Sequence, residues 1–463
     1  EAATSGSNTD LLVHHGSTDA PAVDVAEVEV VNTVLVDDIA YSEFQGYLEL
    51  PTDDYTLQVL DAAGITPIAA YEAPLATLGL QGAAGVVVAS GFLDPSNNSN
   101  GPAFGLFVAL PSGGPLVALP ATSNYVARAQ FIHNSADAAA EFVDVYLNDV
   151  LAVDNFEFRT STAFLDLPAG VPFDLTIQPS NSTDTTNALA QFNYLLDNNA
   201  TYVGVADGIV SGSGYSPATP FDIEIYDMGR EAASSFNNVD VLVHHGSTDA
   251  PTVDVYETGS VNATIVNDLP YAGFQGYLEL PLGDYTLQVL DGDAITPVAA
   301  YEAPLQSLGL QGSAITLVAS GFLDPSNNSN GPAFGLFASL PSGGPLVALP
   351  EANNNAARAQ VIHNAADAAA EQVDVYFNST LVLDNFEFRT ASPYVTVPAN
   401  IPFDVSIQPS NSNDTANALA KFTYDLADEE TYVLVADGIV SPSGYSPAPG
   451  FNLEVYYMGR EAA

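Results

Sequence analysis

The sequence contains no cysteine, and its basic residues are scarce. Without cysteine, the chain can form neither a disulfide framework nor a zinc–thiolate site, and it has no thiol nucleophile. Seven Lys plus Arg residues stand against 56 Asp plus Glu, which gives a formal net charge of -49, and Lys421 is the sole lysine. Nucleic acids and anionic membranes both require clustered cations, so neither is expected as a partner.

A charge of this size repels itself and costs stability at low ionic strength. At about 1 M salt the screening length falls to about 3 Å, and most of that cost disappears. Abundant aspartate with almost no lysine therefore favours a protein that works in concentrated salt. The alternative is an ordinary acidic surface protein.

The chain also lacks a long apolar run. No stretch reaches the ~18 apolar residues of a membrane span, so direct membrane insertion is not expected. The first residues, "EAATSGSNTD", contain no charged and then apolar leader, and we interpret them as a mature or cropped end. At 47% hydrophobic residues the chain can nevertheless build packed cores.

Internal repetition is the strongest pattern in the sequence. The segment "GFLDPSNNSNGPAFGLF" at 91–107 recurs unchanged at 321–337, and "MGREAA" at 228–233 recurs at 458–463. Both pairs are 230 residues apart (321 − 91 and 458 − 228), which predicts two near-identical units of fixed length.

Each unit divides again into two similar halves. "YLELPTDDYTLQVLD" (47–61) parallels "FLDLPAGVPFDLTIQP" (164–179), and the joins between halves are short and polar. Such joins predict a stiff string of domains with little free swing. The four predicted domains are 9–120, 126–230, 240–350 and 356–460.

Within a domain, apolar and polar residues alternate with a period of two, and Gly, Pro, Asn and Asp clusters bound the segments. No long stretch keeps helical spacing. The sequence therefore predicts an all-β chain of four tandem immunoglobulin-like β-sandwich domains. The order of the strands is left open.

A repeated histidine motif is the first candidate site. "VHHGSTDAPAVDV" (13–25) places His14 and His15 on opposite faces of a strand, so the two rings are not expected to share one ion. One histidine followed four residues later by one aspartate does not supply the three or four ligands of a zinc site. We expect the histidine to anchor the following turn and the aspartate to cap backbone N–H groups there. These residues are His15, Asp19, His133, Asp137, His245, Asp249, His363 and Asp367.

A second aspartate stands at the centre of each Val-Asp-Val. Alternation places it opposite the apolar face formed by the two valines, where it is a solvated strand residue or an edge charge that discourages aggregation. A catalytic carboxylate is the remaining alternative, but no second carboxylate recurs at a consistent position to pair with it. The four residues are Asp24, Asp144, Asp254 and Asp374.

The motif around His15 and Asp24 resembles the signature of the family of domains of unknown function numbered 4397 (DUF4397), and "GYLELPTDDYTLQV" (46–59) is similar to its second element. The resemblance covers the chain as four copies, although the second and fourth carry an extra residue or two before Val143 and Val373. It implies secreted or surface-anchored tandem β-sandwich modules, and it brings no established catalytic residues.

Two further patterns are weaker. The loop "LDPSNNSNGP" (93–102) concentrates oxygen ligands of the kind calcium prefers, but it has a single carboxylate, and turn chemistry explains it better. No Gly-x-Ser-x-Gly elbow accompanies the histidines, although a Ser–His nucleophile remains open. Candidate N-glycosylation acceptors are Asn97, Asn181, Asn199, Asn262, Asn327, Asn378 and Asn413.

We therefore expect a non-enzymatic protein without cofactor, metal or catalytic site. The leading hypothesis is a structural subunit of an extracellular filament, fibre or surface layer, adapted to high salt, whose main partner is itself, head to tail, with other cell-surface components as further partners. The sequence begins with Glu-Ala-Ala and stops after Arg460-Glu461-Ala462-Ala463, and the internal junction has the same residues at 230–233. These matching ends predict that the contact between chains resembles the internal join near residue 231. The alternatives are a surface adhesin or glycan-binding array, and a hydrolase with an accessory sandwich array.

Overall fold

The computed structural model describes residues 2–441 and 443–461, and in these residues the regular structure is β-strands with a few short 3-10 helices. The strands form eight separate sheets, which confirms the prediction of an all-β chain of tandem β-sandwiches. Contacts divide the chain into two compact units, one of residues 1–231 with 340–345 and one of residues 232–339 with 346–463. The four domain ranges given above stay a prediction, and the sandwiches are named here by their strands.

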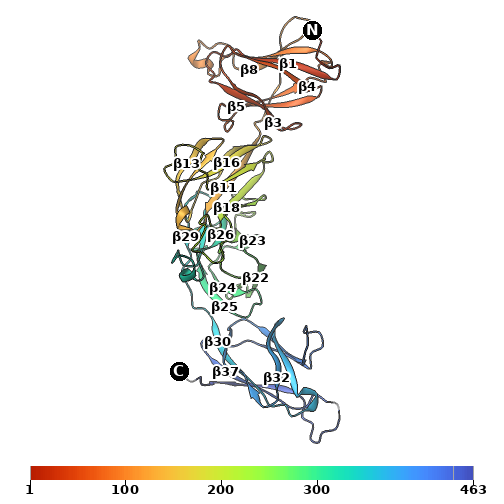
Figure 1. Cartoon of the computed structure of the whole chain (residues 1–463), viewed down its shortest axis with the longest axis vertical. Coiled ribbons are helices and arrows are strands. Elements are labelled where there is room, and N and C mark those ends of the chain that lie inside the picture. Colours follow the sequence, from red (N-terminus) through yellow and green to blue (C-terminus); the bar gives the residue numbers. More distant parts are fainter. Residues whose placement is uncertain (1, 442, 462–463) are drawn as a thin grey trace. The chain divides into compact units, whose positions relative to one another are not determined.

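The first sandwich contains one sheet in the order β4-β1-β7-β8-β9 and a second in the order β10-β6-β5-β2-β3. Strand β1 pairs with β7 in parallel, while the other pairings are antiparallel. The two sheets face each other in red and orange in Figure 1. The strands are β1 (Asn8–His15), β2 (Val23–Glu27), β3 (Thr33–Ile39), β4 (Phe44–Pro51), β5 (Asp54–Asp61), β6 (Pro67–Pro74), β7 (Ala84–Ser90), β8 (Gly105–Ala109), β9 (Val117–Ala118) and β10 (Ala121–Thr122).

The second sandwich repeats the central part of this topology, but two short strands, β14 and β15, pair with β11 where the single strand β4 pairs with β1. Its described sheets also gain β28 and contain no counterpart of β9 or β10. Its sheets run β19-β18-β11-β14-β28 and β13-β12-β16-β17. The strands are β11 (Val126–His133), β12 (Phe142–Leu147), β13 (Val150–Glu157), β14 (Thr160–Ser161), β15 (Leu165–Pro168), β16 (Phe173–Pro179), β17 (Ala190–Tyr194), β18 (Thr201–Asp207), β19 (Asp222–Tyr226) and β28 (Gly344–Pro345).

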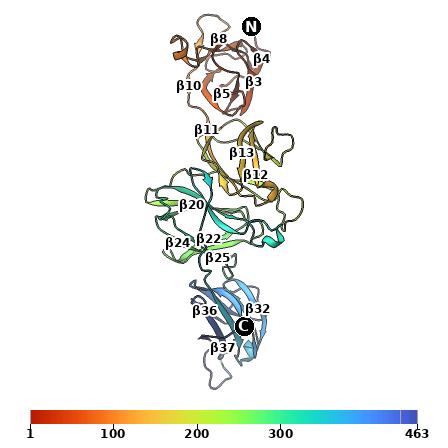
Figure 2. The ribbon, with the colours of Figure 1, turned by 90° about the vertical axis from the view of Figure 1, so that its left-hand side faces the viewer.

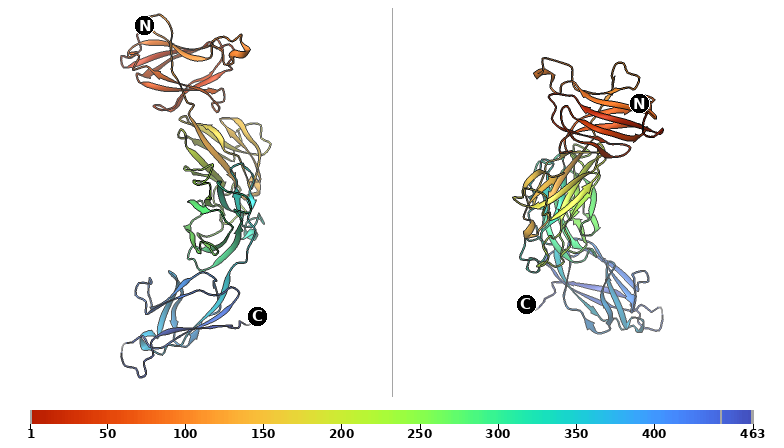
Figure 3. Two further views of the ribbon diagram at one scale, coloured as in Figure 1. Left: turned by 180° about the vertical axis from the view of Figure 1, so that it is seen from behind. Right: turned by 45° about the horizontal axis from the view of Figure 1, so that its top comes forward.

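The third and fourth sandwiches repeat the first and second. The third contains β20 (Asn238–His245), β21 (Val253–Glu257), β22 (Ala263–Leu269), β23 (Phe274–Pro281), β24 (Tyr285–Asp291), β25 (Pro297–Ala303), β26 (Ala314–Ser320), β27 (Gly335–Ser339) and β29 (Val347–Ala348). The fourth contains β30 (Ala356–His363), β31 (Gln372–Phe377), β32 (Thr380–Glu387), β33 (Thr390–Ala391), β34 (Val395–Pro398), β35 (Phe403–Pro409), β36 (Ala420–Tyr424), β37 (Thr431–Asp437) and β38 (Asn452–Tyr457). Figure 3 shows the two-layer arrangement again in the first (red) and fourth (blue) sandwiches.

The alternating sequence explains which side chains enter the core. In β30 every second residue is buried, so that Ala357, Ala359 and Val361 face the core of the fourth sandwich together with Val373 and Phe403. In the first sandwich, strand β2 is buried on both faces along its whole length. Its valines lie in the core between the sheets. Other residues must therefore cover the face of β2 that points away from this core.

Within the first unit, that cover comes from the second sandwich. Ala26, Val28 and Leu60 form a small buried cluster with Val171 of the loop before β16. Gln58 on β5 holds the connecting segment, since its side chain donates to the carbonyl oxygen of Tyr125 (3.0 Å) and accepts from the same residue's N–H. In Figure 2 the chain passes from β10 to β11 at this junction.

The second unit contains the matching junction. Leu290 packs with Tyr256 and Ile401, and Gln288 accepts a hydrogen bond from the backbone N–H of Asn355 (3.1 Å). These residues follow Leu60, Val171 and Gln58 by 230 positions (290 − 60, 401 − 171 and 288 − 58). Each unit thus joins its two sandwiches through the same few positions.

Candidate functional site

The repeated histidine closes a turn in every sandwich. His15 lies at the end of β1 and is 2% exposed, and its Nε2 lies 3.0 Å from the carbonyl oxygen of Pro21. Because a carbonyl oxygen only accepts, Nε2 carries the proton and the ring donates. The equivalent bonds are His133 to Ala140 (2.7 Å), His245 to Pro251 (2.8 Å) and His363 to Ala370 (2.7 Å).

The aspartate four residues later reaches a loop far away in the sequence. Asp19 accepts the backbone N–H groups of Leu93 (2.8 Å) and Asp94 (2.9 Å), which lie in the loop between β7 and β8. The contact spans 74 residues to Leu93, so the carboxylate fastens the turn after β1 to the loop after β7, which is the parallel neighbour of β1 in the same sheet. The same bonds join Asp137 to Val210 and Ser211, Asp249 to Leu323 and Asp324, and Asp367 to Val440 and Ser441.

Three of these carboxylates, those of Asp19, Asp137 and Asp367, have a pKa lowered by their hydrogen-bond donors and are held ionised. The hydrogen bond from the Asp94 backbone lowers the pKa of Asp19. At Asp137 and Asp367 burial opposes ionisation, but hydrogen bonds from the 3-10 turn and from the distant loop outweigh it and lower the pKa. In their charged form these three aspartates therefore hold the distant loop against the turn. The sequence had predicted that they cap backbone N–H groups in the local turn alone.

The Val-Asp-Val aspartates serve a different backbone feature. Asp24 Oδ1 accepts the N–H of Asp38 (2.7 Å), a residue with a positive φ of 52° at the irregular pairing of β2 with β3. A non-glycine residue in this conformation is strained, and a satisfied N–H helps to hold it there. The other three pairs are Asp144 with Asn155, Asp254 with Asp268 and Asp374 with Asn385, and each acceptor serves a residue with φ between 49° and 51°.

The prediction of a solvated or edge position for these aspartates is wrong. Asp24 is 4% exposed and Asp144 is fully buried. Strand β2 lies between β3 and β5, so it is not an edge strand. The alternation placed each side chain away from the valine face as predicted, but that second face is buried as well.

The pKa values of equivalent aspartates shift in opposite directions because the side chains accept different numbers of hydrogen bonds. Burial raises the pKa of Asp24 and of Asp254, where the one backbone donor does not compensate. Burial also opposes ionisation at Asp144, but Asn155 and the backbone and hydroxyl of Ser182 (2.8 and 2.7 Å) all donate to it and lower its pKa.

The buried histidines of the second and fourth sandwiches, His133 and His363, are neutral. Burial lowers the pKa of His133 from 6.5 to about 4, against the opposing effect of its bond to Ala140, and burial also lowers the pKa of His363. In the unfolded chain His133 takes up a proton below about pH 6.5, whereas in the folded chain it does so only near pH 4. Its contribution to stability is therefore present at neutral pH and lost as the pH falls from about 6.5 to 4.

We expect the substitution His133→Gln to remove this pH dependence. Glutamine can still donate to the Ala140 carbonyl but does not titrate. In scanning calorimetry at constant high salt, the wild-type second sandwich should lose about 3 kcal/mol more than the variant between pH 7 and pH 4. Parallel melting curves for the two proteins over this range would contradict a buried neutral histidine.

The adjacent histidines do not converge on an ion. The His14 ring stacks on Phe44 with centroids 4.2 Å apart and its Nδ1 lies 2.9 Å from the Glu43 carbonyl oxygen, while His15 faces the turn. Residues 2–441 and 443–461 contain no group of three or more His, Asp or Glu side chains placed to hold a metal.

The loop at 93–102 is organised by its own aspartate. Asp94 begins the 3-10 helix η1 (Pro95–Asn97) and accepts the backbone N–H of Ser96 (2.9 Å), its hydroxyl (2.5 Å) and the Asn97 amide (2.5 Å). The carboxylate's oxygens are thus engaged within the turn, which supports turn chemistry over calcium binding.

The candidate glycosylation acceptors differ in accessibility. Asn97, Asn181, Asn199, Asn262, Asn327 and Asn413 are exposed. Asn378 is half-buried, and its amide donates to the carbonyl oxygen of Ala294 (3.3 Å) at the junction of the second unit. Glycosylation of Asn378 would therefore compete with this contact.

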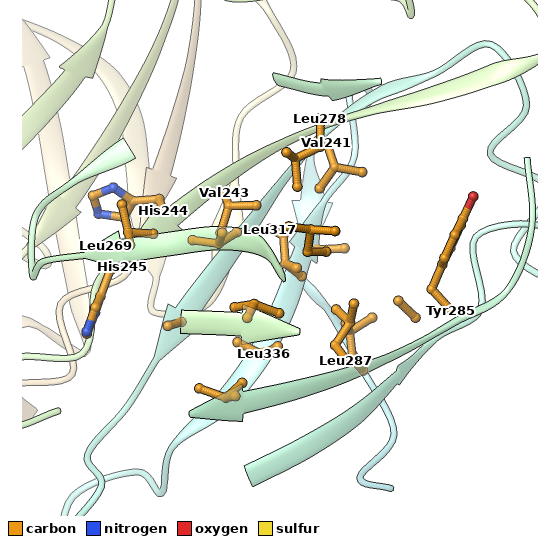
Figure 4. A pocket seen from close by; sticks show the side chains of 18 of the residues that line it. Val241, Val243, His244, His245, Leu269, Leu278, Tyr285, Leu287, Leu317 and Leu336 are labelled. Carbon is orange, nitrogen blue, oxygen red and sulfur yellow. The ribbon is translucent and has the colours of Figure 1, made fainter. Parts of the chain in front are cut away.

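A cavity of about 50 Å³ lies between the sheets of the third sandwich. Figure 4 shows leucine and valine side chains along it, with His244 and His245 at one end and Tyr285 at the other. The first sandwich has a similar space of about 40 Å³. An apolar gap between two sheets, without converging polar groups, is a feature of core packing rather than a catalytic pocket.

The segments that match a known protein family lie in the first and third sandwiches. The model of DUF4397, a domain of unknown function, matches residues 9–88 and 239–330. The DUF4397 model thus matches segments in two of the four sandwiches. The match contains the histidine turn, the Val-Asp-Val strand and the distant loop that Asp249 fastens in the third sandwich. The second and fourth sandwiches share the topology but lie outside the matched segments.

Similar solved structures resemble the chain only loosely. They include the Bacillus anthracis TIE protein (9% identity, 93% of this chain and 67% of that chain, TM-score 0.14). A streptococcal virulence factor described as binding alpha-glucan aligns at 11% identity over 42% of this chain and 93% of that chain (TM-score 0.15). The pilus adhesin SpaC from Lactobacillus rhamnosus GG aligns at 10% identity over 73% of this chain and 46% of that chain (TM-score 0.15). TM-scores this low carry no argument about function, and no curated protein matches the sequence.

Among the described residues, no helix has the length and hydrophobicity that a bilayer crossing requires.

Sequence reasoning missed the two structural roles of aspartate described above. A signal for the first was present: in all four copies the anchoring aspartate precedes the loop residues that it contacts by 73 to 75 positions.

Proposed function

We propose that the chain is a structural subunit of an extracellular filament, fibre or surface layer, built by head-to-tail stacking of β-sandwiches and adapted to high salt. In this function the protein is not an enzyme and its principal partner is another copy of itself, with other cell-surface components as further partners. The repeated polar residues of the histidine motif stabilise the fold in every copy.

The repeated junction is the observation that carries this proposal. The first and second sandwiches join through Leu60, Val171 and Gln58, and the third and fourth join through the residues 230 positions later. Each two-sandwich unit contains the same buried junction between its sandwiches. Repetition of such a unit along a chain is suited to an extended array in which every unit has the same internal arrangement. Open head-to-tail contacts between identical chains then produce filaments when the rotation does not close a ring.

We expect the purified chain to assemble in about 1 M NaCl, where screening reduces the repulsion between chains. Electron microscopy should show fibres or sheets of uniform width, and sedimentation velocity should show species that grow with protein concentration. A monomer at every salt and protein concentration would overturn the proposal.

A second candidate function is a surface adhesin or glycan-binding module. The first sandwich exposes three aromatic side chains near the start of β4: Tyr41 (51%), Phe44 (61%) and Tyr47 (53%). Exposed aromatic clusters on a soluble protein commonly mark interaction sites. Glycan binding by monomers, lost in a Phe44→Ala/Tyr47→Ala double variant, would favour this function over the structural one.

A further inference from the structure

The edge of the second sandwich is completed by a short segment from later in the chain. The first unit includes residues 340–345, and in it β28 (Gly344–Pro345) pairs antiparallel with the edge strand β14 (Thr160–Ser161). The Gln130 amide donates to the carbonyl oxygens of both Thr162 (2.9 Å) and Leu340 (2.8 Å). The segment therefore acts as an added strand, held at its start by a buried side chain.

The contact requires glycine at position 343, because the segment lies very close to the backbone of the second sandwich there. A Cβ placed on Gly343, whose φ is +69°, would lie 2.4 Å from the backbone nitrogen of Ala163 and 2.4 Å from the carbonyl carbon of Thr162. Real Cβ atoms do not approach backbone atoms so closely, so any other residue would push the segment away from the sandwich.

The fourth sandwich presents the same edge without the added strand. Strand β33 (Thr390–Ala391) pairs with β30 as β14 pairs with β11, and among the described residues it is the last strand of its sheet. Gln360 donates to the carbonyl oxygen of Ser392 (2.9 Å), but its amide reaches no second acceptor in the described chain. Correspondingly, Ser161 is buried, whereas Ala391 is exposed.

The chain also carries a second copy of the added segment. Residues 110–115 have the same sequence as 340–345, Leu-Pro-Ser-Gly-Gly-Pro, and occupy the same place between two strands of the first sandwich. Their backbone is already in the same form, because Gly113 and Gly114 have φ of +71° and +106° where Gly343 and Gly344 have +69° and +98°. Gly113 N–H donates to Leu110 O at 2.9 Å, as Gly343 does to Leu340.

In the first sandwich this segment is exposed, and the space beside its two glycines is open. A Cβ on Gly113 or Gly114 would meet no atom within 4 Å. The following residue, Leu116, is 45% exposed, whereas the equivalent Leu346 is 8% exposed. One chain thus contains both an open strand edge and a preformed segment of the type that closes that edge in the first unit.

We infer that the segment 110–115 of one copy adds to the edge strand β33 of a second copy, pairing Pro115 with Thr390 and Gly114 with Ala391. This is β-augmentation between identical chains, and it rests on the proposed self-assembly. Two paired residues fix the register rather than supply the affinity. The apolar side chain of Leu116, which directly follows the segment and is 45% exposed, adds contact area.

One difference separates the two edges. Pro393 stands where the second sandwich has Ala163, so the fourth sandwich lacks a backbone N–H just beyond the pairing. The two residues that pair, Thr390 and Ala391, keep their backbone donors and acceptors. The inferred contact therefore uses these two residues and the Gln360 amide.

The substitution Gly113→Asn tests the inference in the full chain. Asparagine tolerates positive φ and its Cβ has free space in the isolated chain, so the variant should fold, but in the complex the Cβ would collide with the partner backbone. Gly79→Asn is the matched control, because Gly79 has φ +70° and equally open surroundings. In about 1 M NaCl we expect Gly113→Asn to weaken self-association at least tenfold in sedimentation velocity, with the control unchanged.

Engineered cysteines give an independent readout, since the chain has none of its own. Directly opposed residues of an antiparallel pair lie at distances that suit a disulfide. The pair Pro115→Cys with Thr390→Cys should give a ladder of disulfide-linked multimers on a non-reducing gel, whereas Ser96→Cys with Thr390→Cys should not.

The outcomes separate this inference from the proposed function. If the wild-type chain never assembles, both fail. If it assembles but Gly113→Asn associates with wild-type affinity and the cysteine pair gives no ladder, the segment is not the contact, and the structural role survives without it.

Discussion

Replacement of Asp137 by alanine should destabilise the second sandwich by about 3 to 5 kcal/mol. Asp137 is 1% exposed and accepts the backbone N–H groups of Ala139 (3.0 Å), Val210 (2.9 Å) and Ser211 (2.6 Å), and also the Ser211 hydroxyl (2.7 Å). Removing the carboxylate would leave several buried donors without an acceptor, and it would release the loop after β18 from the turn after β11. Calorimetry should show one transition at a markedly lower temperature.

The matched control is Asp184→Ala. Asp184 also accepts a backbone N–H and a hydroxyl, both from Thr186, but within an exposed turn where water replaces the lost acceptor. We expect this variant to melt close to the wild type. Equal melting of both variants would mean that the distant loop is held by other contacts.

The second large effect is a rise in thermal stability with salt. We expect melting midpoints to increase by roughly 10 °C between about 0.1 and 1 M NaCl, since screening relieves carboxylate repulsion in the folded chain. Salt also weakens ion pairs, but the structure offers few of them. Arg128 pairs with Asp166 and Glu231 at 2.8 and 2.7 Å, and Arg358 pairs with Glu461 at 2.8 Å. Exposed pairs of this kind contribute about 0 to 1 kcal/mol each, which is small beside the repulsion of a net charge of -49.

Sodium perchlorate distinguishes screening from a general strengthening of apolar burial. Below about 1 M, a screening effect should appear in perchlorate as well as in chloride, because it depends on ionic strength. Midpoints that stay flat or fall with NaCl would remove the argument for salt adaptation and leave the acidity unexplained.

The sequence by itself determined the fold class and the repetition. The period of two in segments such as 173–179 specified that Phe173, Leu175 and Ile177 enter a core, and the identical segments 230 residues apart specified two equivalent units. Local chemistry also indicated that the histidine would close the turn that follows it, as the bond from His15 to Pro21 does. These features depend on residues close together in the chain.

The tertiary structure decided what covers each surface. Alternation placed Asp24 opposite the valines, but only the folded sandwich shows that its carboxylate is buried and accepts the N–H of the positive-φ residue Asp38. Likewise, the order of strands, including the parallel pairing of β1 with β7, does not follow from any local pattern.

The edge strands show the same limit most clearly. Thr160–Ser161 and Thr390–Ala391 have similar sequences and the same pairing within their sandwiches, yet the structure closes one edge with residues 344–345 and leaves the other open. Strand propensity specifies that a segment is extended and which face is apolar. Its backbone donors and acceptors point sideways, and their partner is set by which distant segment the completed fold brings to that edge.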